Sequence, residues 1–124
     1  MARRSTIECG AAAEAAAADF LQTQGLLVLA RNLRCKAGEL DLVCLHEGVI
    51  VIVEVRQRTA SGFGGALASV TWRKQRKLIR ATEFFRQRQP AWRARALRFD
   101  VIAVQGRPDG THEMQWIRDA FRVT

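Results

Sequence analysis

Four charged residues stand where two apolar, strand-like segments begin and end. The segment GELDLVCLH opens with Glu39 and Asp41, and the segment VIVIVEVRQR closes with Glu54 and Arg56. Side chains two residues apart on a strand point to the same face, so each pair can share one face of a sheet. Mg²⁺ takes oxygen ligands and often needs only one or two carboxylates together with water. The four residues are therefore a candidate cluster for metal-assisted chemistry.

The connection between the two segments predicts how these residues meet. If Glu47-Gly48 is a two-residue turn, the register places Asp41 directly opposite Glu54 and Glu39 opposite Arg56. Directly opposed carboxylates have Cβ atoms roughly 5 Å apart and destabilise a sheet unless something compensates. A bound divalent cation and a structural ion network would each compensate. The residues alone leave both interpretations open.

Two helical segments could contribute further groups. Leu78, Ala81 and Phe85 recur at helical spacing as a core stripe, and Lys74 extends that stripe by one turn. Lys74 is therefore expected to point toward one rim of the sheet. Glu14 interrupts an alanine-rich segment whose small side chains would let a helix approach the sheet closely. A single glutamate in such a helix faces either the sheet or solvent, and this choice is open too.

The chain has a net charge of +8, and that charge is regional. Residues 55–99 hold twelve Lys or Arg and one acid, whereas the remainder holds eight basic and eleven acidic residues. Such a block favours a nucleic-acid partner over a merely solvated helix face, with an anionic membrane surface as the lesser alternative. Arg73, Lys77 and Arg80 are spaced for one helical stripe beside Arg76 and could contact phosphates.

Two aromatic residues accompany the basic block. Phe63 and Trp72 could stack on unpaired bases, which would add affinity for single strands. Packing inside the protein is the more common role of each residue type, and that interpretation is favoured here.

Periodicity and turn signals predict the elements that hold these residues. We expect a helix over residues 10–24, strands over 26–34, 39–46, 49–58 and 96–104, and a flexible loop over 61–65. A second helix is expected from a cap at Ser69 or Thr71 to just before Pro90. HEMQWI predicts a last short strand and RDAF a final helical turn. The order α-β-β-β-α-β predicts an α/β protein with a mixed sheet flanked by helices. We expect a single domain over 10–124 after a flexible N-terminus at 1–9.

Other features exclude several classes of protein. Three cysteines without a C-x-x-C pair predict neither a disulfide framework nor a zinc site, and they suit a reducing, cytoplasmic setting. Cys44 lies in an apolar run and is expected in the core. His46 and His112 are far apart in sequence and are expected at the surface near turns. Asp100 is expected to form a structural ion pair with Arg98. No run is long enough to span a membrane.

The motifs taken together resemble a known family. The pattern G-x3-E, FL-x3-G-x6-N, GELDLV, VEVRQR, FGGA, KQ and RFDVIAV, from residue 10 to about residue 104, is similar to the YraN-like family of small bacterial proteins, as is the tail WIRDAF. The resemblance implies a restriction-endonuclease-like fold of the PD-(D/E)xK superfamily, similar to archaeal Holliday-junction resolvases. It implies Mg²⁺ or Mn²⁺ as cofactor, DNA as partner and a homodimer as the assembly that a two-fold symmetric junction would suit.

The resemblance also implies roles for matching positions. Asp41 and Glu54 match the acidic pair of the PD-(D/E)xK motif as metal ligands, and Glu14 matches a helix glutamate that can complete the site. Arg56 stands where the motif has lysine, and no proline precedes Asp41. Further matching positions near the expected centre are Glu39, Lys74 and Gln75. The expected nucleic-acid contacts are Arg58, Arg73, Lys74, Gln75, Arg76, Lys77 and Arg80.

The arginine is the departure from the motif that bears most on chemistry. A lysine beside the attacking water could give up a proton if its pKa were depressed, whereas arginine stays charged. Arg56 could still orient the scissile phosphate or stabilise its developing charge. The base would then come from Glu39 or from a metal-bound water, and Lys74 could supply the missing ammonium.

Two hypotheses from different classes follow. The first is a Mg²⁺- or Mn²⁺-dependent endonuclease that hydrolyses DNA phosphodiester bonds, expected to act at branched or junction DNA. The second is a non-catalytic nucleic-acid-binding module on the same fold, with Arg56 in a structural ion network. A protein–protein adaptor that uses the basic helix on an acidic partner is a weaker third.

Overall fold

A five-stranded mixed sheet in the order β1-β2-β3-β4-β5 forms the centre of the protein. The computed structural model describes residues 6–58, 65 and 67–123, with side chains from residue 10 onward. The strands are β1 (Leu27–Cys35), β2 (Gly38–His46), β3 (Val49–Arg58), β4 (Leu97–Gly106) and β5 (His112–Phe121). Only β3 and β4 run parallel, and every other neighbouring pair is antiparallel.

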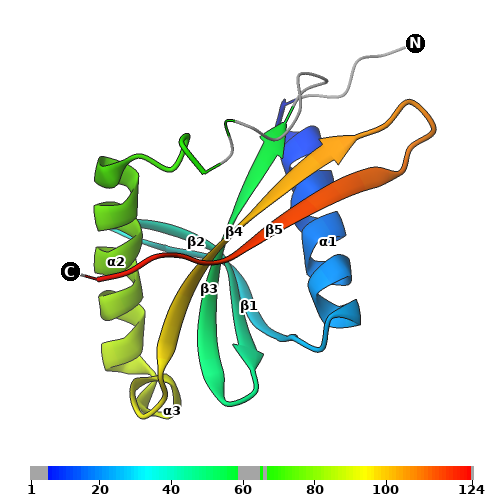
Figure 1. Cartoon of the computed structure of the whole chain (residues 1–124). Helices are drawn as coiled ribbons and strands as arrows, with labels where there is room; N and C mark the ends of the chain where they lie inside the picture. The colour runs from blue at the N-terminus through cyan, green and yellow to red at the C-terminus, as the bar shows by residue number, and fades with distance from the viewer. Residues whose placement is uncertain (1–5, 59–64, 66, 124) are drawn as a thin grey trace.

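Helices cover the two faces of this sheet, and Figure 1 shows α1 and α2 on opposite sides of it. Helix α1 (Thr6–Thr23) begins four residues before the predicted start, and Gly25 follows it with a φ of 91°. Helix α2 (Trp72–Arg88) and the short helix α3 (Pro90–Arg93) form the crossover that a parallel pair of strands requires. The predicted α/β class and the order α-β-β-β-α-β are confirmed, and the predicted last short strand HEMQWI is part of β5.

Helices α1 and α2 each cover a hydrophobic cluster on one face of the sheet. The alanines and Leu21 of α1 pack against a cluster on one face of the sheet that includes Leu42, Cys44 and Val53. Leu78 and Ala81 of α2 pack against the other face, with Ile50, Ile52 and Val101 among their neighbours. The predicted core positions of Cys44, Leu78 and Ala81 are confirmed. Because alanine removes side-chain bulk, α1 lies close to the strands that carry the acidic residues.

Local signals set two of the element boundaries as predicted. The β2–β3 turn has positive φ at both central residues, 51° at Glu47 and 81° at Gly48, which matches the right-handed twist of a two-residue hairpin. Thr71 caps α2, because its Oγ1 accepts a hydrogen bond of 3.2 Å from the Lys74 backbone N–H. The predicted loop over 61–65 lies outside the described residues, apart from Gly65.

The prediction of a final helical turn at RDAF is wrong, because these residues belong to β5. Asp119 has a φ of 50°, and the β4–β5 register shifts between Phe99 and Val101. At that irregularity the Asp119 backbone N–H donates a 2.9 Å hydrogen bond to Asp100 Oδ1. A buried carboxylate from β4 therefore satisfies the unpaired amide, and the chain stays extended as far as the pair between Phe99 and Phe121.

No helix in the described part of the chain combines the length and apolar character needed to cross a membrane.

Candidate active site

The end of the β2–β3 hairpin brings Asp41 and Glu54 together. The two strands pair from His46 with Val49 to Leu42 with Val53, which is the predicted register. Just beyond the last pair, Asp41 Oδ2 accepts a 2.9 Å hydrogen bond from the Val55 backbone N–H. The side chain of Asp41 therefore takes over the acceptor role of the ladder where the strands separate. This hydrogen bond holds its carboxylate next to that of Glu54, whose titration it influences.

A change of face within β2 accounts for the position of Asp41. Leu40 packs with α2 and Leu42 packs with α1, although residues two apart on a regular strand share a face. Across the β1–β2 ladder, Asp41 and Asn32 lie between the same two residue pairs, and Asn32 has a φ of 52°. Asparagine tolerates this left-handed region better than most residues. Both strands thus bend at the position that carries the acid.

Glu54 is a buried carboxylate, with 4% of its surface exposed. Burial, and then the charge of Asp41, raises the pKa of Glu54 to about 7, against the opposing effect of Lys74 and Arg56. Burial also raises the pKa of Asp41 despite its hydrogen bond from Val55. Burial and mutual repulsion therefore oppose ionisation of both carboxyl groups, and a bound cation would offset that cost.

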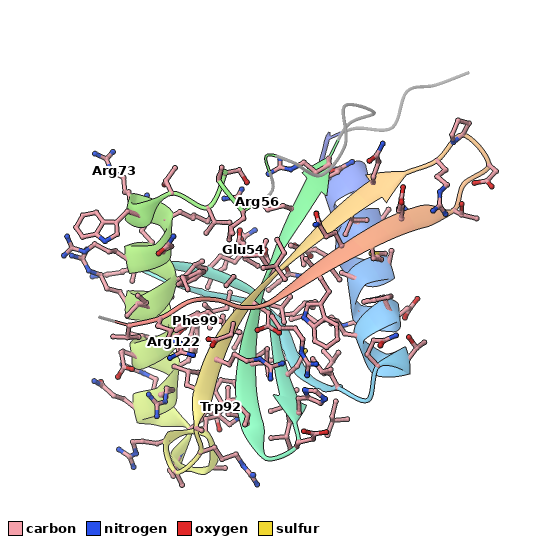
Figure 2. All side chains as sticks on the ribbon, viewed as in Figure 1. Glu54, Arg56, Arg73, Trp92, Phe99 and Arg122 are labelled. Atoms are coloured by element: carbon pink, nitrogen blue, oxygen red, sulfur yellow. The ribbon has the colours of Figure 1, made fainter. Side chains whose placement is uncertain are left out.

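Two basic side chains flank Glu54. Arg56 Nε and Lys74 Nζ each lie 3.7 Å from Glu54 Oε1. Arg56 Nη2 also donates a 3.2 Å hydrogen bond to the Ser69 carbonyl, just before α2. Figure 2 shows Glu54 and Arg56 on β3 beside the N-terminal end of α2, from which Arg73 projects away from them. The prediction that Lys74 points to the rim of the sheet is confirmed.

The predicted partner of Glu39 is wrong. In the β1–β2 ladder Glu39 pairs with Arg34, and its Oε1 lies 3.5 Å from Arg34 Nε, whereas Arg56 pairs with Glu54 instead. The predicted pairing requires the hairpin register to continue beyond Leu42, but β2 changes face there and the hairpin ladder ends. Glu39 still acts on the cluster electrostatically, because its negative charge raises the pKa of Asp41. Its role as a catalytic base stays a prediction.

Glu14 faces the cluster from α1. Burial, and then the charge of Asp41, raises the pKa of Glu14, while a hydrogen bond with the Asn32 side chain lowers it. The glutamate is therefore near the acidic pair rather than on the solvent side of its helix. Asn32 is a residue to which sequence reasoning assigned no role. Its signals were its place in the G-x6-N part of the family pattern and the presence of an asparagine inside a strand-like run, where this residue type is depleted.

The arrangement fits a divalent cation bound by two carboxylates. Glu54 Oε2 is buried and has no hydrogen-bond partner among the described residues, and Asp41 supplies a second carboxylate beside it. Mg²⁺ commonly binds through one or two carboxylates and keeps several waters, so this pair is a sufficient ligand set. The described residues contain no group of three or more His, Cys, Asp or Glu side chains that could hold a metal ion. Glu14 as a third ligand stays a prediction.

The expected nucleic-acid contacts include exposed side chains and side chains that are hydrogen-bonded within the protein. Arg73, Arg76, Lys77 and Arg80 are exposed on α2, as their spacing predicted. Two other expected contacts already have partners within the protein. Arg58 Nη2 donates to the Gly65 carbonyl and to Ser69 Oγ, and Gln75 Nε2 donates a 3.0 Å hydrogen bond to the Val70 carbonyl. The bonds from Arg58 brace the segment before α2 against β3, and the bond from Gln75 joins that segment to α2. Nucleic-acid contacts by all of these residues stay predictions.

The favoured packing role of Trp72 is wrong, because 68% of this residue is exposed. The guanidinium carbon of Arg76 lies 4.8 Å from the centre of its ring. Helix α2 buries the stripe that contains Leu78 and Ala81, and Trp72 lies outside that stripe. The predicted alternative, stacking on unpaired bases, is therefore sterically open at this position. Phe63 lies outside the described residues.

A second polar cluster, around Asp100 of β4, which pairs with Val53 of β3, is structural. Arg98 Nε lies 2.9 Å from Asp100 Oδ1, which confirms the predicted ion pair. Trp116 Nε1 also donates to Asp100, at 2.8 Å. The expectation of a surface position for His46 is wrong, because His46 is only 8% exposed and its Nδ1 lies 3.4 Å from Arg98 Nη2. The register places His46 beside this cluster, a contact that sequence spacing alone could not show.

Comparisons with known proteins establish the family of the chain. A sequence model of the family described as "Uncharacterised protein family UPF0102" matches residues 13–104. The chain belongs to this family. UPF0102 is also the YraN family, so the resemblance drawn from the motifs is confirmed.

UPF0102 relatives match the chain over nearly its whole length. A UPF0102 protein of Pseudomonas putida strain GB-1 is 49% identical over 121 residues, which covers 98% of each chain. A UPF0102 protein of Pseudomonas syringae pv. syringae strain B728a is 48% identical with the same coverage. One of Pseudomonas entomophila strain L48 is 50% identical over 112 residues, covering 90% of this chain and 91% of its own.

Proposed function

We propose that this UPF0102 protein is a Mg²⁺- or Mn²⁺-dependent endonuclease that hydrolyses phosphodiester bonds of DNA, with branched or junction DNA as its substrate. The observation that supports this most directly is the Asp41–Glu54 pair. Both carboxylates have raised pKa values, and a buried oxygen of Glu54 has no hydrogen-bond partner among the described residues. A site of this kind is stabilised by a divalent cation and lies next to the exposed basic residues of α2.

Each residue of the site has a distinct part in this proposal. Asp41 and Glu54 would hold the cation, which would supply Lewis-acid stabilisation of the phosphate charge when bound. Arg56 and Lys74, which flank Glu54, would orient the scissile phosphate and stabilise the negative charge that develops on it. Arg73, Lys77 and Arg80 would contact phosphates farther along the strand and contribute affinity without sequence readout.

Lys74 supports the proposal despite the arginine at the motif's lysine position. Arginine cannot act as a proton donor or acceptor near neutral pH, but it retains its charge and its planar set of donors. The ammonium of Lys74 reaches the same oxygen of Glu54 from α2. The site therefore combines two carboxylates, a guanidinium and an ammonium, and the ammonium comes from α2 rather than from β3.

A panel of branched, flap and linear duplex DNA tests the proposal. Purified protein is incubated with each substrate in Mg²⁺, in Mn²⁺ and in EDTA. We expect metal-dependent cleavage that Asp41→Ala and Glu54→Ala both abolish, while Asp109→Ala, at an exposed acid in the β4–β5 turn, retains it. Cleavage that survives both Asp41→Ala and Glu54→Ala would point to a contaminating nuclease and contradict the proposed site.

The second candidate is a non-catalytic nucleic-acid-binding module, and the contacts of Arg56 favour it. Arg56 bridges Glu54 and the Ser69 carbonyl, which is also how a structural ion network would use it. This alternative predicts salt-sensitive DNA or RNA binding without metal binding. Calorimetric titration with Mn²⁺ separates the two, because binding that Asp41→Asn abolishes counts against the module.

A further inference from the structure

A groove between α2 and the C-terminal end of β5 lies on a different side of α2 from the acidic site. It encloses about 690 Å³, and its lining residues are Trp72, Gln75, Arg76, Ile79, Arg80, Phe121, Arg122 and Val123. The five residues from α2 follow helical spacing, so they form one continuous stripe along the helix. Lys74, which reaches the acidic site, is about 200° around the helix from Trp72. Figure 2 shows Arg122 beside α2.

The chemistry of the groove is cationic with an apolar floor. Arg76, Arg80 and Arg122 carry positive charge, and the described residues that line the groove include no acid. Asp119 lies beside it and binds Arg122 Nη2 at 2.6 Å, which holds that guanidinium in place and offsets part of its charge. Ile79 and Phe121 supply apolar surface between the arginines. A long anionic chain with flat apolar groups would match both features.

Trp72 narrows the choice of ligand. An exposed tryptophan ring at the mouth of a cationic groove is costly in water, and it is a stacking surface for a planar group. Arg76 lies against the ring, so a cation and an aromatic face are presented together. Aromatic stacking combined with backbone-tracking positive charge is how proteins bind single-stranded nucleic acid without sequence preference. Bases within a duplex are already stacked on one another and cannot use such a platform.

We propose that this groove binds the unpaired nucleotides of the DNA substrate, with a base stacked on Trp72 and the adjoining phosphates on Arg76, Arg80 and Arg122. The inference rests on the proposed function and deepens it, because it assigns the preferred substrate to DNA that carries a single-stranded segment. The bound segment lies beside the acidic site rather than within it, since the groove and Lys74 are on different sides of the first turn of α2.

Binding without metal tests the groove separately from cleavage. Fluorescence anisotropy in EDTA compares a fluorescein-labelled oligothymidylate with a labelled hairpin duplex that has the same number of phosphates. We expect Trp72→Ala to weaken single-strand binding about 10-fold and to change duplex binding by less than about twofold. Trp72→Phe keeps an aromatic face and should retain most of the affinity. Leu27→Ala, which removes an exposed apolar side chain on β1, is the matched control and should change neither.

Three results would overturn the inference. The first is single-strand affinity that Trp72→Ala leaves unchanged. The second is an equal loss for single strand and duplex, because that result would assign Trp72 a general role in folding or charge placement. The third is tighter binding of polyglutamate than of oligothymidylate, because an acidic peptide would then be the better ligand. Thermal melting of each variant verifies that the exposed substitutions leave the fold intact.

The same measurements distinguish this inference from the proposed function. Trp72-dependent single-strand binding without metal-dependent cleavage would support the groove and contradict the nuclease. Cleavage that depends on Asp41 and Glu54 with single-strand binding indifferent to Trp72 would support the nuclease and contradict the groove. A wild-type protein that binds neither oligonucleotide in EDTA would contradict the groove, whereas the cleavage panel alone decides the nuclease.

Discussion

Lys74 Nζ on α2 lies 3.7 Å from Glu54 Oε1 on β3, so the first turn of the helix places an ammonium beside a buried carboxylate. Thr71 fixes where that helix begins, because its hydroxyl caps the Lys74 backbone amide. The cap and the ion pair act on the same residue. The ammonium expected at the catalytic position therefore comes from α2, whereas β3 supplies the guanidinium of Arg56.

Replacing Lys74 tests whether this ammonium takes part in catalysis. Lys74→Met should lower kcat/KM for cleavage about 100-fold, because one positive group would be lost from the phosphate site. Mn²⁺ affinity measured by calorimetry should be retained or rise, since Lys74 competes with a cation for Glu54. Arg73→Met removes the neighbouring exposed charge and should cost far less. Equal losses for the two variants would show that Lys74 acts only as part of the general basic surface.

Asp41→Asn tests the metal site and keeps a side chain that can accept the Val55 hydrogen bond at the open end of the β2–β3 hairpin. The amide oxygen can still accept the hydrogen bond from Val55, so the fold should be preserved. Loss of one carboxylate ligand should weaken Mn²⁺ binding at least about 10-fold, since even substituting a residue that only positions a metal ligand costs about that much. Asp109→Asn provides the control. Unchanged Mn²⁺ binding in Asp41→Asn would exclude Asp41 as a ligand.

The raised pKa of Glu54 predicts how stability depends on pH in the absence of metal. Because the pKa is about 7 in the folded protein against an ordinary value of 4.5, the folded protein holds this proton more tightly than the unfolded chain. The resulting stability is complete below pH 4.5 and is lost as the pH rises through about 7. Glu54→Gln should remove this dependence and gain on the order of 2 kcal/mol relative to wild type between pH 4.5 and 8.

Urea unfolding in EDTA, followed by tryptophan fluorescence at several pH values, measures that difference. Glu83→Gln, at an exposed acid of α2, is the control and should track the wild-type protein. A difference between Glu54→Gln and wild type that does not change with pH would contradict the raised pKa of Glu54.

Substituting Asp100 should lower stability and leave metal binding intact, whereas substituting Asp41 should weaken metal binding and preserve the fold. Its carboxylate is fully buried and binds Arg98, Trp116 Nε1 and the Asp119 amide. Asp100→Ala leaves these donors unpaired, so it should lower the free energy of unfolding by about 3 kcal/mol and leave Mn²⁺ affinity unchanged. Glu113→Ala, at a half-exposed ion pair, should change stability by less than about 1 kcal/mol. Altered metal binding in Asp100→Ala without loss of stability would contradict this structural role.

The exposed stripe on α2 should determine the salt dependence of duplex binding. Substituting Arg73, Lys77 and Arg80 together by glutamine should make the slope of log affinity against log salt shallower by about 2 to 3, since each phosphate contact contributes about 0.9. The matched control is the triple substitution of Arg34, Lys36 and Arg107, three basic residues outside α2. An unchanged slope in the first triple variant would favour an acidic protein as the partner of this helix.

Much of the site follows from short-range rules that act within one hairpin or one helix. A two-residue turn fixes the hairpin register as far as Leu42 and Val53, which is sufficient to bring Asp41 next to Glu54. Helical spacing from Leu78 and Ala81 is sufficient to turn Lys74 toward the sheet. Thr71 and Pro90 mark the limits of α2 because capping and the lack of a proline N–H act locally. These features are therefore determined by the sequence itself.

Only the tertiary structure decided the remaining features, because each depends on contacts between distant segments. Glu39 pairs with Arg34 because β2 changes face at Asp41, and beyond that point β2 stays paired with β1. RDAF stays extended because the Asp100 carboxylate, from another strand, accepts the Asp119 amide. Trp72 is exposed because α2 turns the opposite stripe to the sheet. Local propensity contains no information about which distant group will satisfy an amide or cover a ring, and packing decides it.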